Sequence, residues 1–329
     1  MDFQSFPKVE LHHHLDCSLS YQVVQRLDPS ITVEDFQRDF VAPAKCLDLV
    51  DFLRYSPRHF ALMQTAEQLR LATLDVFEQL HTQHTIYAEL RFAPFLHTQK
   101  GLSLEDIVSA VNEATTEARR EWGIEGRIIL CTLRHYSEEE SLQTVKLVKQ
   151  FQGTNVVGFD LAGDEAGYPL APHIAAYRYA IENGLHYTAH AGEASGPQSV
   201  WETLEYIHPR RIGHGARSIE DPRLIEHLKA QHIHLEICPS SNVQTNLCAS
   251  YEDHPVDQLY KDGVSLSINT DSYTITDVTI NKEYERLHNT FNWTPHNFLR
   301  CNLHALEFAF IPNQLKSQLE QSLRAGYPS

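Results

Sequence analysis

The chain has 329 residues, 42% of them hydrophobic, so it is long enough to bury a large core as one α/β barrel or as two ordinary domains. Its formal net charge of −16, from 43 acidic and 27 basic residues, repels phosphate backbones and anionic membrane surfaces, which argues against nucleic-acid and membrane partners. The first residues contain no basic segment followed by an apolar one, and no later run approaches about 18 apolar residues. The six cysteines lack Cys-x-x-Cys spacing. We therefore expect a soluble cytoplasmic protein with reduced thiols.

The stretch Val9–Asp16, with the sequence Val-Glu-Leu-His-His-His-Leu-Asp, predicts a first β-strand near the N-terminus. Successive side chains of a strand point to opposite faces, so His12 and His14 lie on one face and His13 lies on the other. Two histidines on one face of a strand could bind a metal ion, or they could be core histidines hydrogen-bonded to their neighbours. If His12 and His14 bind a metal ion, the rest of the chain must supply further ligands.

Residues 18–83 contain segments with helical spacing and no convincing strand. This stretch is too long to be a simple loop, so we expect a helical insertion after the first strand that acts as a lid.

From residue 84 onward, short apolar runs alternate with amphipathic segments. With Val9–Leu15, the strand-like runs are 86–92, 127–133, 156–161, 185–190, 211–214, 233–238 and 264–269. Most of them are followed by a helix-like segment, such as 104–122 and 138–151. This order predicts one α/β domain over residues 1–329, a single (β/α)8 TIM barrel. A doubly wound fold is disfavoured, because no Gly-x-Gly-x-x-Gly follows the first strand.

Polar side chains gather where the predicted strands end, which is where a (β/α)8 barrel builds its active site. They are His12, His14 and Asp16 after the first strand, 160–165 after the fourth, 190–193 after the fifth, His214 after the sixth and 269–272 after the eighth. We therefore expect these side chains to meet at one mouth of the barrel.

Three imidazoles and one carboxylate from this group, those of His12, His14, His190 and Asp271, form a ligand set suited to zinc. A single ion per chain is favoured, because the fourth strand contains no Lys that could be carbamylated to bridge two metals. Glu193 could then move a proton between a metal-activated water and a substrate nitrogen, and His214 could stabilise that water electrostatically.

Each of these residues also has a purely structural interpretation. Glu193 could be a solvated loop acid, His214 a capping group in a Gly-flanked turn and Asp271 a helix N-cap. The segment His234-Leu235-Glu236 matches the His-x-Glu of zinc deaminases that act on cytosine, but no Pro-Cys-x-x-Cys follows, so we interpret it as part of the seventh strand.

Five motifs together resemble those of the adenosine deaminase branch of the amidohydrolase superfamily, in the same order over nearly the whole chain. They are residues 8–16, 160–165, 188–193, 211–215 and 267–271. The resemblance implies a (β/α)8 barrel with one Zn²⁺ held by His12, His14, His190 and Asp271. It also implies that metal hydroxide attacks purine C6 while Glu193 protonates N1, with His214 and Asp271 as the other catalytic residues.

The same resemblance implies a small-molecule purine nucleoside substrate, with substrate contacts from His14, Asp16, Gly163 and Ser272. The Gly163 amide would meet N3 and Asp16 would meet a ribose hydroxyl. Two positions depart from the family pattern: Cys17 replaces the usual Gly, and Ser272 replaces an Asp that normally contacts N7. Loss of such a hydrogen bond costs on the order of 1–3 kcal/mol of recognition.

The expected activity is therefore hydrolysis of adenosine and 2′-deoxyadenosine to the inosine nucleoside and ammonia. An alternative, suggested by Ser272 and Cys17, is deamination of adenine or another 6-aminopurine derivative. A third is a binding protein that keeps the fold without catalysis.

Overall fold

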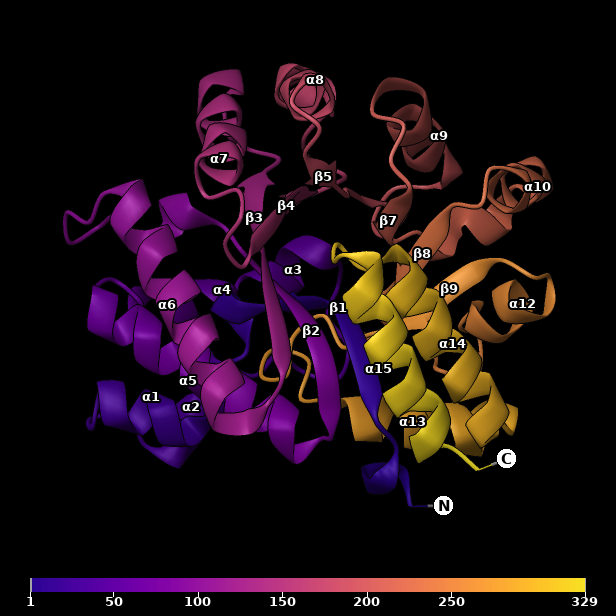
Figure 1. Ribbon diagram of the computed structural model, residues 1–329, viewed down its shortest axis with the longest axis horizontal. Helices are drawn as coiled ribbons and strands as arrows, with labels where there is room; N and C mark the ends of the chain where they lie inside the picture. The colour runs from indigo at the N-terminus through magenta and orange to yellow at the C-terminus, as the bar shows by residue number, and fades with distance from the viewer. Residues whose placement is uncertain (1, 329) are drawn as a thin grey trace.

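The computed structural model describes residues 2–328 and contains nine parallel strands surrounded by helices (Figure 1). The strands are β1 (Lys8–His14), β2 (Thr85–Phe92), β3 (Glu125–Leu133), β4 (Val156–Ala162), β5 (His186–Tyr187), β6 (His190–Ala191), β7 (Arg211–His214), β8 (His234–Ile237) and β9 (Ser265–Ile268). The helices are α1 (Tyr21–Leu27), α2 (Val33–Asp39), α3 (Leu49–Leu53), α4 (Ser56–Ala61), α5 (Ala66–Thr82), α6 (Leu104–Trp122), α7 (Glu138–Gln150), α8 (Ile174–Glu182), α9 (Pro197–Tyr206), α10 (Pro222–Ala230), α11 (Pro239–Gln244), α12 (Val256–Lys261), α13 (Ile280–Phe291), α14 (Pro295–Phe308) and α15 (Asn313–Gly326).

The strands form two parallel sheets in chain order, β1 to β5 and β6 to β9. The sequence predicted one strand over 185–190, but the structure divides it into β5 and β6 at Thr188 and Ala189. Hydrogen bonds continue through the break, because the Thr188 amide donates to the Phe159 carbonyl at 3.0 Å and the Gly213 amide donates to the Ala189 carbonyl at 2.9 Å. β5 and β6 therefore occupy one position in the barrel, as the predicted (β/α)8 fold requires.

The barrel closes between β9 and β1. The His14 amide donates to the Asp271 carbonyl at 2.7 Å, and the Asp271 amide donates to the His12 carbonyl at 3.1 Å. Nearer the start of β1, a side chain takes the place of a backbone carbonyl as the acceptor: Oδ1 of Asn269 accepts from the Leu11 amide at 2.8 Å. The same hydrogen bonds that complete the barrel thus fix Asp271 beside His12 and His14.

The segment 18–83 contains five helices and no strand, in agreement with the sequence. Its last helix, α5, does not lie over the barrel mouth: it packs against α6 and β2 and buries Val76 and Phe77 in the main core. It is therefore the first helix of the barrel wall. Residues of α3 and α4 line the cavities at the mouth. The lid role of these two helices stays a prediction.

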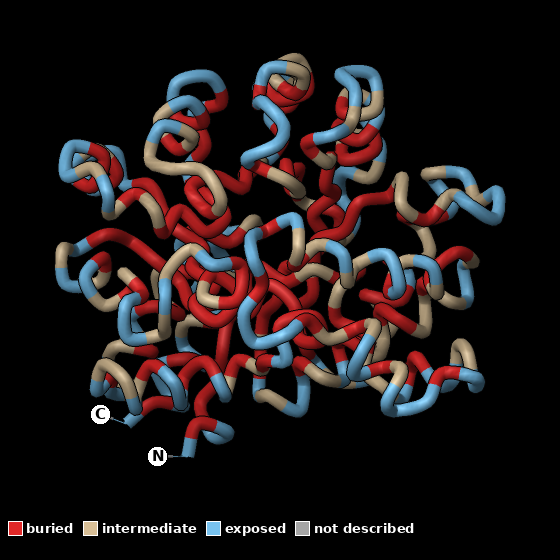
Figure 2. The backbone as a smooth tube through the Cα atoms, turned by 180° about the vertical axis from the view of Figure 1, so that it is seen from behind, coloured by how far each residue is buried: buried red, intermediate tan, exposed pale blue. Residues whose placement is uncertain are grey.

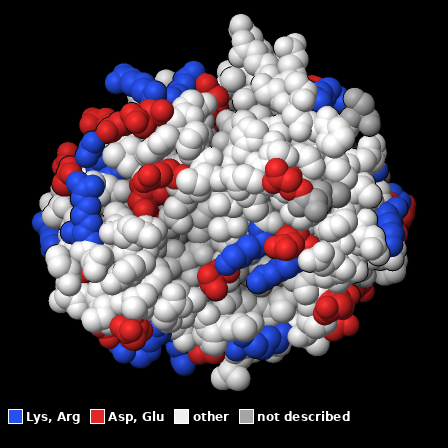
Figure 3. Space-filling model, turned by 90° about the horizontal axis from the view of Figure 1, so that it is seen from below, with Lys and Arg blue, Asp and Glu red and all other residues white. Residues whose placement is uncertain are grey.

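Burial is greatest at the strands and falls toward the outer turns of the surrounding helices (Figure 2). Charged side chains of both signs are interspersed on the face seen in Figure 3. Among residues 2–328, no helix combines the length and the apolar character that crossing a membrane requires.

Candidate metal and catalytic site

The predicted metal ligands meet at the C-terminal ends of the strands. One ligand atom each from His12, His190, His214 and Asp271 lies within 4.8 Å of the others. His14 joins this group, because its Nε2 is 3.2 Å from Nε2 of His190 and 3.5 Å from Oδ1 of Asp271. Five groups from four barrel positions thus face one point.

The local backbone explains how these side chains come so close. His214 and Asp271 adopt left-handed conformations, with φ of 60° and 66°, which residues other than Gly rarely do. A Cβ on Gly213 would lie 2.9 Å from Cε1 of His12, so a side chain there would displace the imidazole. Such strained and crowded positions concentrate at functional sites.

Two buried carboxylates orient the imidazoles of His12 and His190. Glu236 Oε2 lies 2.8 Å from Nδ1 of His12, and Asp160 Oδ2 lies 3.1 Å from Nδ1 of His190. Arg91 joins both carboxylates, with Nη1 2.8 Å from Asp160 and Nη2 2.7 Å from Glu236. Metal-binding histidines commonly have this arrangement, in which a carboxylate accepts the Nδ1 proton and leaves the Nε2 lone pair for the ion.

The electrostatics keep these carboxylates ionised. Burial pushes the pKa of Asp160 and of Glu236 upward, but neighbouring side chains outweigh this effect. His190 and Arg91 hold the pKa of Asp160 well below its usual range. Arg91 and Arg211 hold the pKa of Glu236 well below its usual range. An ionised carboxylate can only accept a hydrogen bond, so Nδ1 of His12 and of His190 must donate. Their Nε2 atoms are then free to bind a metal ion.

His214 has the opposite orientation. A chain of hydrogen bonds begins at the Val256 amide, which donates to Nδ1 of His254 at 3.1 Å. Nε2 of His254 must therefore carry a proton, which it donates to Oδ1 of Asn242 at 3.2 Å, and Nδ2 of Asn242 donates to Nδ1 of His214 at 3.0 Å. Since Nδ1 of neutral His214 accepts, its Nε2 carries a proton and cannot also bind a metal.

The donor set fits a metal ion on these grounds. Nε2 of His12 is buried and has no hydrogen-bond partner in the described part of the chain. Burial lowers the pKa of His14 and of His190, so both rings are held neutral, which is the form that binds metals. Asp271 supplies Oδ1, 3.4 Å from Nε2 of His12, while its Oδ2 accepts from the Ser241 hydroxyl at 2.7 Å. Three imidazoles and one carboxylate suit Zn²⁺.

Glu193 lies beside His214, with its Oε2 3.5 Å from Nε2 of that ring. Burial, together with the charges of Asp271 and Glu165, raises the pKa of Glu193 well above its usual range. Its Oε1 is buried and has no hydrogen-bond partner among residues 2–328. A carboxyl held in the protonated form can donate a proton to a bound molecule.

Glu165 holds the loop that carries Glu193. Its two carboxylate oxygens accept from the backbone amides of Gly192, Glu193, Ala194 and Ser195 at 2.7–3.0 Å. The sequence placed Glu165 in a strand-end motif without a role, and its contacts now show that it positions the loop.

The predicted substrate contacts surround a small cavity next to the cluster. This cavity has a volume of about 50 Å³ and is lined by His14, Cys17, Leu49, Phe52, Leu53, Ala162, Gly163, His190, Glu193, His214, Asp271 and Ser272. The Ser272 hydroxyl faces that of Thr276 at 3.1 Å. Asp16 lies just outside: it accepts from the Ala93 amide at 3.2 Å, and burial raises its pKa to about 6.

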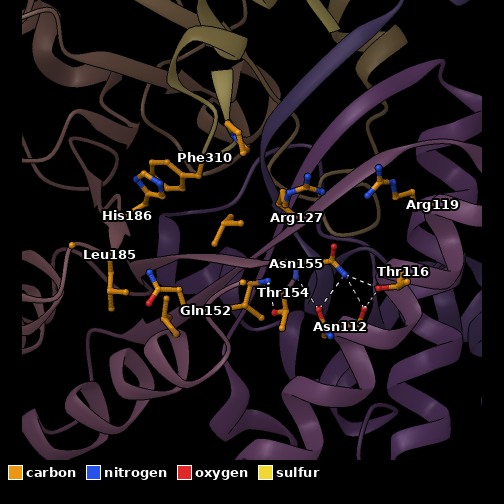
Figure 4. Close-up of a pocket in the computed structure, with 16 residues that line it drawn as sticks. Asn112, Thr116, Arg119, Arg127, Gln152, Thr154, Asn155, Leu185, His186 and Phe310 are labelled. Carbon is orange, nitrogen blue, oxygen red and sulfur yellow. Dashed lines mark hydrogen bonds between the residues drawn. The ribbon is translucent and has the colours of Figure 1, made fainter. Parts of the chain in front are cut away.

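A larger cavity, of about 620 Å³, lies between α6, α7 and the opposite ends of β3 and β4 (Figure 4). Its Asn155 side chain is already hydrogen-bonded to Asn112 and Thr116. Among residues 2–328, His186 is the one histidine that lines it, and no Asp, Glu or Cys does. It therefore lacks a cluster of metal-binding and proton-transfer groups like that at the other end of the barrel.

The fold and the cluster define a class, the (β/α)8 hydrolases that carry a candidate metal site at the C-terminal ends of their strands. The family model described as adenosine deaminase matches residues 7–325. The chain therefore belongs to the adenosine deaminase family, whose members are metal-dependent hydrolases acting on C–N bonds.

Individual relatives agree with this assignment. The chain is 31% identical to an adenosine deaminase of Clostridium perfringens over 98% of its own length and 99% of the relative's. The likeness to solved structures concerns the fold. The chain shares the fold of an adenine deaminase from Arthrobacter aurescens, with a TM-score of 0.90, 24% identity and coverage of 97% and 98% of the two chains. It also resembles an amidohydrolase from Burkholderia ambifaria with bound zinc, with a TM-score of 0.88, 23% identity and coverage of 98% and 91%.

Proposed function

We propose that this protein is a zinc-dependent adenosine deaminase, which converts adenosine and 2′-deoxyadenosine with water to the inosine nucleoside and ammonia. The observation that carries the proposal is the difference in tautomer between the histidines. His12 and His190 turn bare Nε2 atoms to the centre of the cluster, while His214 turns an N–H toward it. This is what one metal ion and one activated water require.

The metal would be held by His12, His14, His190 and Asp271, and when bound it supplies Lewis-acid activation of the attacking water. The protonated Glu193 donates its proton to purine N1, which makes C6 more electrophilic. His214 Nε2–H donates a hydrogen bond to the oxygen that adds to C6.

The proton balance can be followed through Glu193. After donating to N1, the carboxylate accepts a proton from the attacking water. The C6–O bond forms and the C6–N bond then breaks. The proton of the added hydroxyl goes to the departing amine, which leaves as ammonia, while C6 keeps the oxygen as a carbonyl and N1 keeps its proton. Gly163, which lines both cavities at the site, would contact N3, and Asp16 would contact a ribose hydroxyl.

One observation favours a second candidate within the same chemistry. Ser272 occupies the cavity where the family pattern has an acid for N7, and its hydroxyl lies near Thr276. A hydroxyl lacks the charge-assisted strength of a carboxylate, so the substrate could be adenine or another 6-aminopurine derivative.

The test is a spectroscopic screen of adenosine, 2′-deoxyadenosine, adenine and AMP with metal-loaded enzyme, in parallel with Glu193→Gln. We expect the nucleosides to be deaminated and the variant to lose at least about a hundredfold in kcat. Preference for free adenine would select the alternative, and full activity of Glu193→Gln would refute the role of that residue. We also propose a cytoplasmic location, supported by six cysteines that are all free.

A further inference from the structure

A second cavity, of about 330 Å³, adjoins the small cavity at the metal cluster. The two cavities share the lining residues His14, Cys17, Leu53, Ala162 and Gly163. A molecule that reaches the cluster past Gly163 can therefore extend directly into this second cavity.

The walls of the second cavity are mainly apolar. Leu53, Pro57 and Phe60 come from α3 and α4, and Leu96 and Leu133 come from the segments at the ends of β2 and β3. The remaining lining residues are His14, Asp16, Cys17, Ser56, Ala93, Cys131, His135, Ala162, Gly163 and Asp164. No Lys or Arg from the described part of the chain lines it, and its acidic residues are Asp16 and Asp164. Burial raises the pKa of the Cys17 and Cys131 thiols, which keeps them neutral.

The chemistry of the purine ring determines which part of a substrate would enter. The proposed function places C6 at the cluster, N1 at Glu193 and N3 at Gly163. N9 is separated from N3 by one ring carbon and lies on the side of the ring away from C6. The sugar on N9 must therefore pass Gly163 toward Asp16, and both of these residues line the second cavity. With Asp16 at a hydroxyl of the ribose ring, the exocyclic 5′ carbon would extend into the rest of this cavity, whose wall includes Leu96, Leu133 and Phe60.

We propose that the preferred substrate is a 6-aminopurine nucleoside whose 5′ carbon carries an uncharged apolar group, such as an alkylthio group, in place of a hydroxyl or a phosphate. This inference rests on the proposed function. A 5′-phosphate carries nearly two negative charges, and here it would lose water with no Lys or Arg to pair with, while it approached the carboxylates of Asp16 and Asp164. An apolar 5′ group gains from leaving water.

The experiment compares kcat/KM for 5′-methylthioadenosine, adenosine and AMP with the metal-loaded enzyme. Burial of a methylthio group should raise kcat/KM by roughly tenfold over adenosine. AMP should be at least about a hundredfold poorer than adenosine. Equal or better use of adenosine or AMP would overturn the substrate class while leaving the deaminase reaction intact. Failure of all three, with adenine also inert, would instead overturn the proposed function.

Two variants test whether the apolar wall causes the preference. Phe60→Ser should reduce the ratio of kcat/KM for 5′-methylthioadenosine to that for adenosine by several-fold. Leu133→Arg should raise the ratio for AMP to adenosine at least tenfold, because it supplies the missing cation. The matched control is Val33→Ser on α2, which is 46% exposed and outside the cavity, and which should leave both ratios unchanged. Unchanged ratios in both cavity variants, with thermal unfolding showing folded protein, would refute the inference.

Discussion

The hydrogen-bond chain from Val256 to His214 makes a sharp prediction for the substitution Asn242→Asp. Asn242 is fully buried, and its amide donates to Nδ1 of His214 at 3.0 Å. Aspartate has nearly the same size, but in its ionised form it can only accept. It would draw the proton of His214 onto Nδ1 and leave a bare Nε2 facing Glu193, 3.5 Å away.

The magnitude follows from the hydrogen bond that is lost. His214 Nε2–H is the donor proposed for the oxygen that adds to C6, and removal of one such preorganised donor costs about 2.7–4 kcal/mol, or 10²–10³ in kcat. Asn242 does not line either cavity at the site, so KM should change by less than about threefold. The metal content should stay at the wild-type value, because His12, His14, His190 and Asp271 are untouched.

The assay is steady-state deamination with the best nucleoside substrate, together with ¹⁵N chemical shifts of the imidazole rings, which report which nitrogen is protonated. The control is Asn246→Asp, the same chemical change at an exposed position just after the same helix. Wild-type kcat in Asn242→Asp, or a rise in KM with unchanged kcat, would refute the hydrogen-bonding role of His214.

Three further predictions concern the surrounding structure. Buried His97, hydrogen-bonded to the Met63 carbonyl at 2.9 Å, has its pKa lowered by burial to about 4. The unfolded chain takes up a proton on His97 near pH 6.5, whereas the folded chain does so only near pH 4. The free energy of unfolding therefore falls by up to about 3 kcal/mol as the pH falls from 6.5 toward 4. Denaturant unfolding should show a shallower acid dependence for His97→Gln than for the wild type, and an identical dependence would contradict this role of His97. Arg91→Met leaves buried Asp160 without its guanidinium and leaves Glu236 with Arg211 alone, so it should lower the free energy of unfolding by about 3–5 kcal/mol. A change below 1 kcal/mol would contradict the bridging role. Glu165→Gln replaces the carboxylate that accepts from four backbone amides of the loop carrying Glu193. It should reduce kcat by about tenfold or more without loss of metal. Unchanged kcat would show that the loop does not need the Glu165 carboxylate.

Much of the site could be predicted from the sequence, because its residues stand at strand ends. His12 and His14 follow from the alternation of β1, and His190, His214 and Asp271 each come at or just after a short apolar run. The ends of parallel strands meet at one edge of the barrel, so residues far apart in the chain could be placed together without coordinates.

Other parts depended on packing that leaves no local pattern. Arg91 and Glu236 both point into the barrel, at positions where a sequence pattern predicts an apolar residue. Their ion pair joins β2 to β8 across the barrel. Asn242 and His254 lie in α11 and the loop before α12, and nothing in their spacing indicates that they orient His214. The assignment of α5 to the barrel wall, and the break between β5 and β6, also depend on neighbours that are distant in the sequence.

The measurement that tests the central claim most directly is the zinc content of purified wild-type protein and of the variants His14→Ala, His190→Ala and His214→Ala, by mass spectrometry of the metal. His190 turns a bare Nε2 toward the cluster, His14 places its Nε2 3.5 Å from Oδ1 of Asp271, and His214 carries a protonated Nε2. We therefore predict one equivalent of zinc in the wild type, its loss in His14→Ala and His190→Ala, and its retention in His214→Ala with little turnover. The account would be contradicted if His190→Ala retained zinc. It would also be contradicted if His214→Ala lost zinc while His14→Ala retained it.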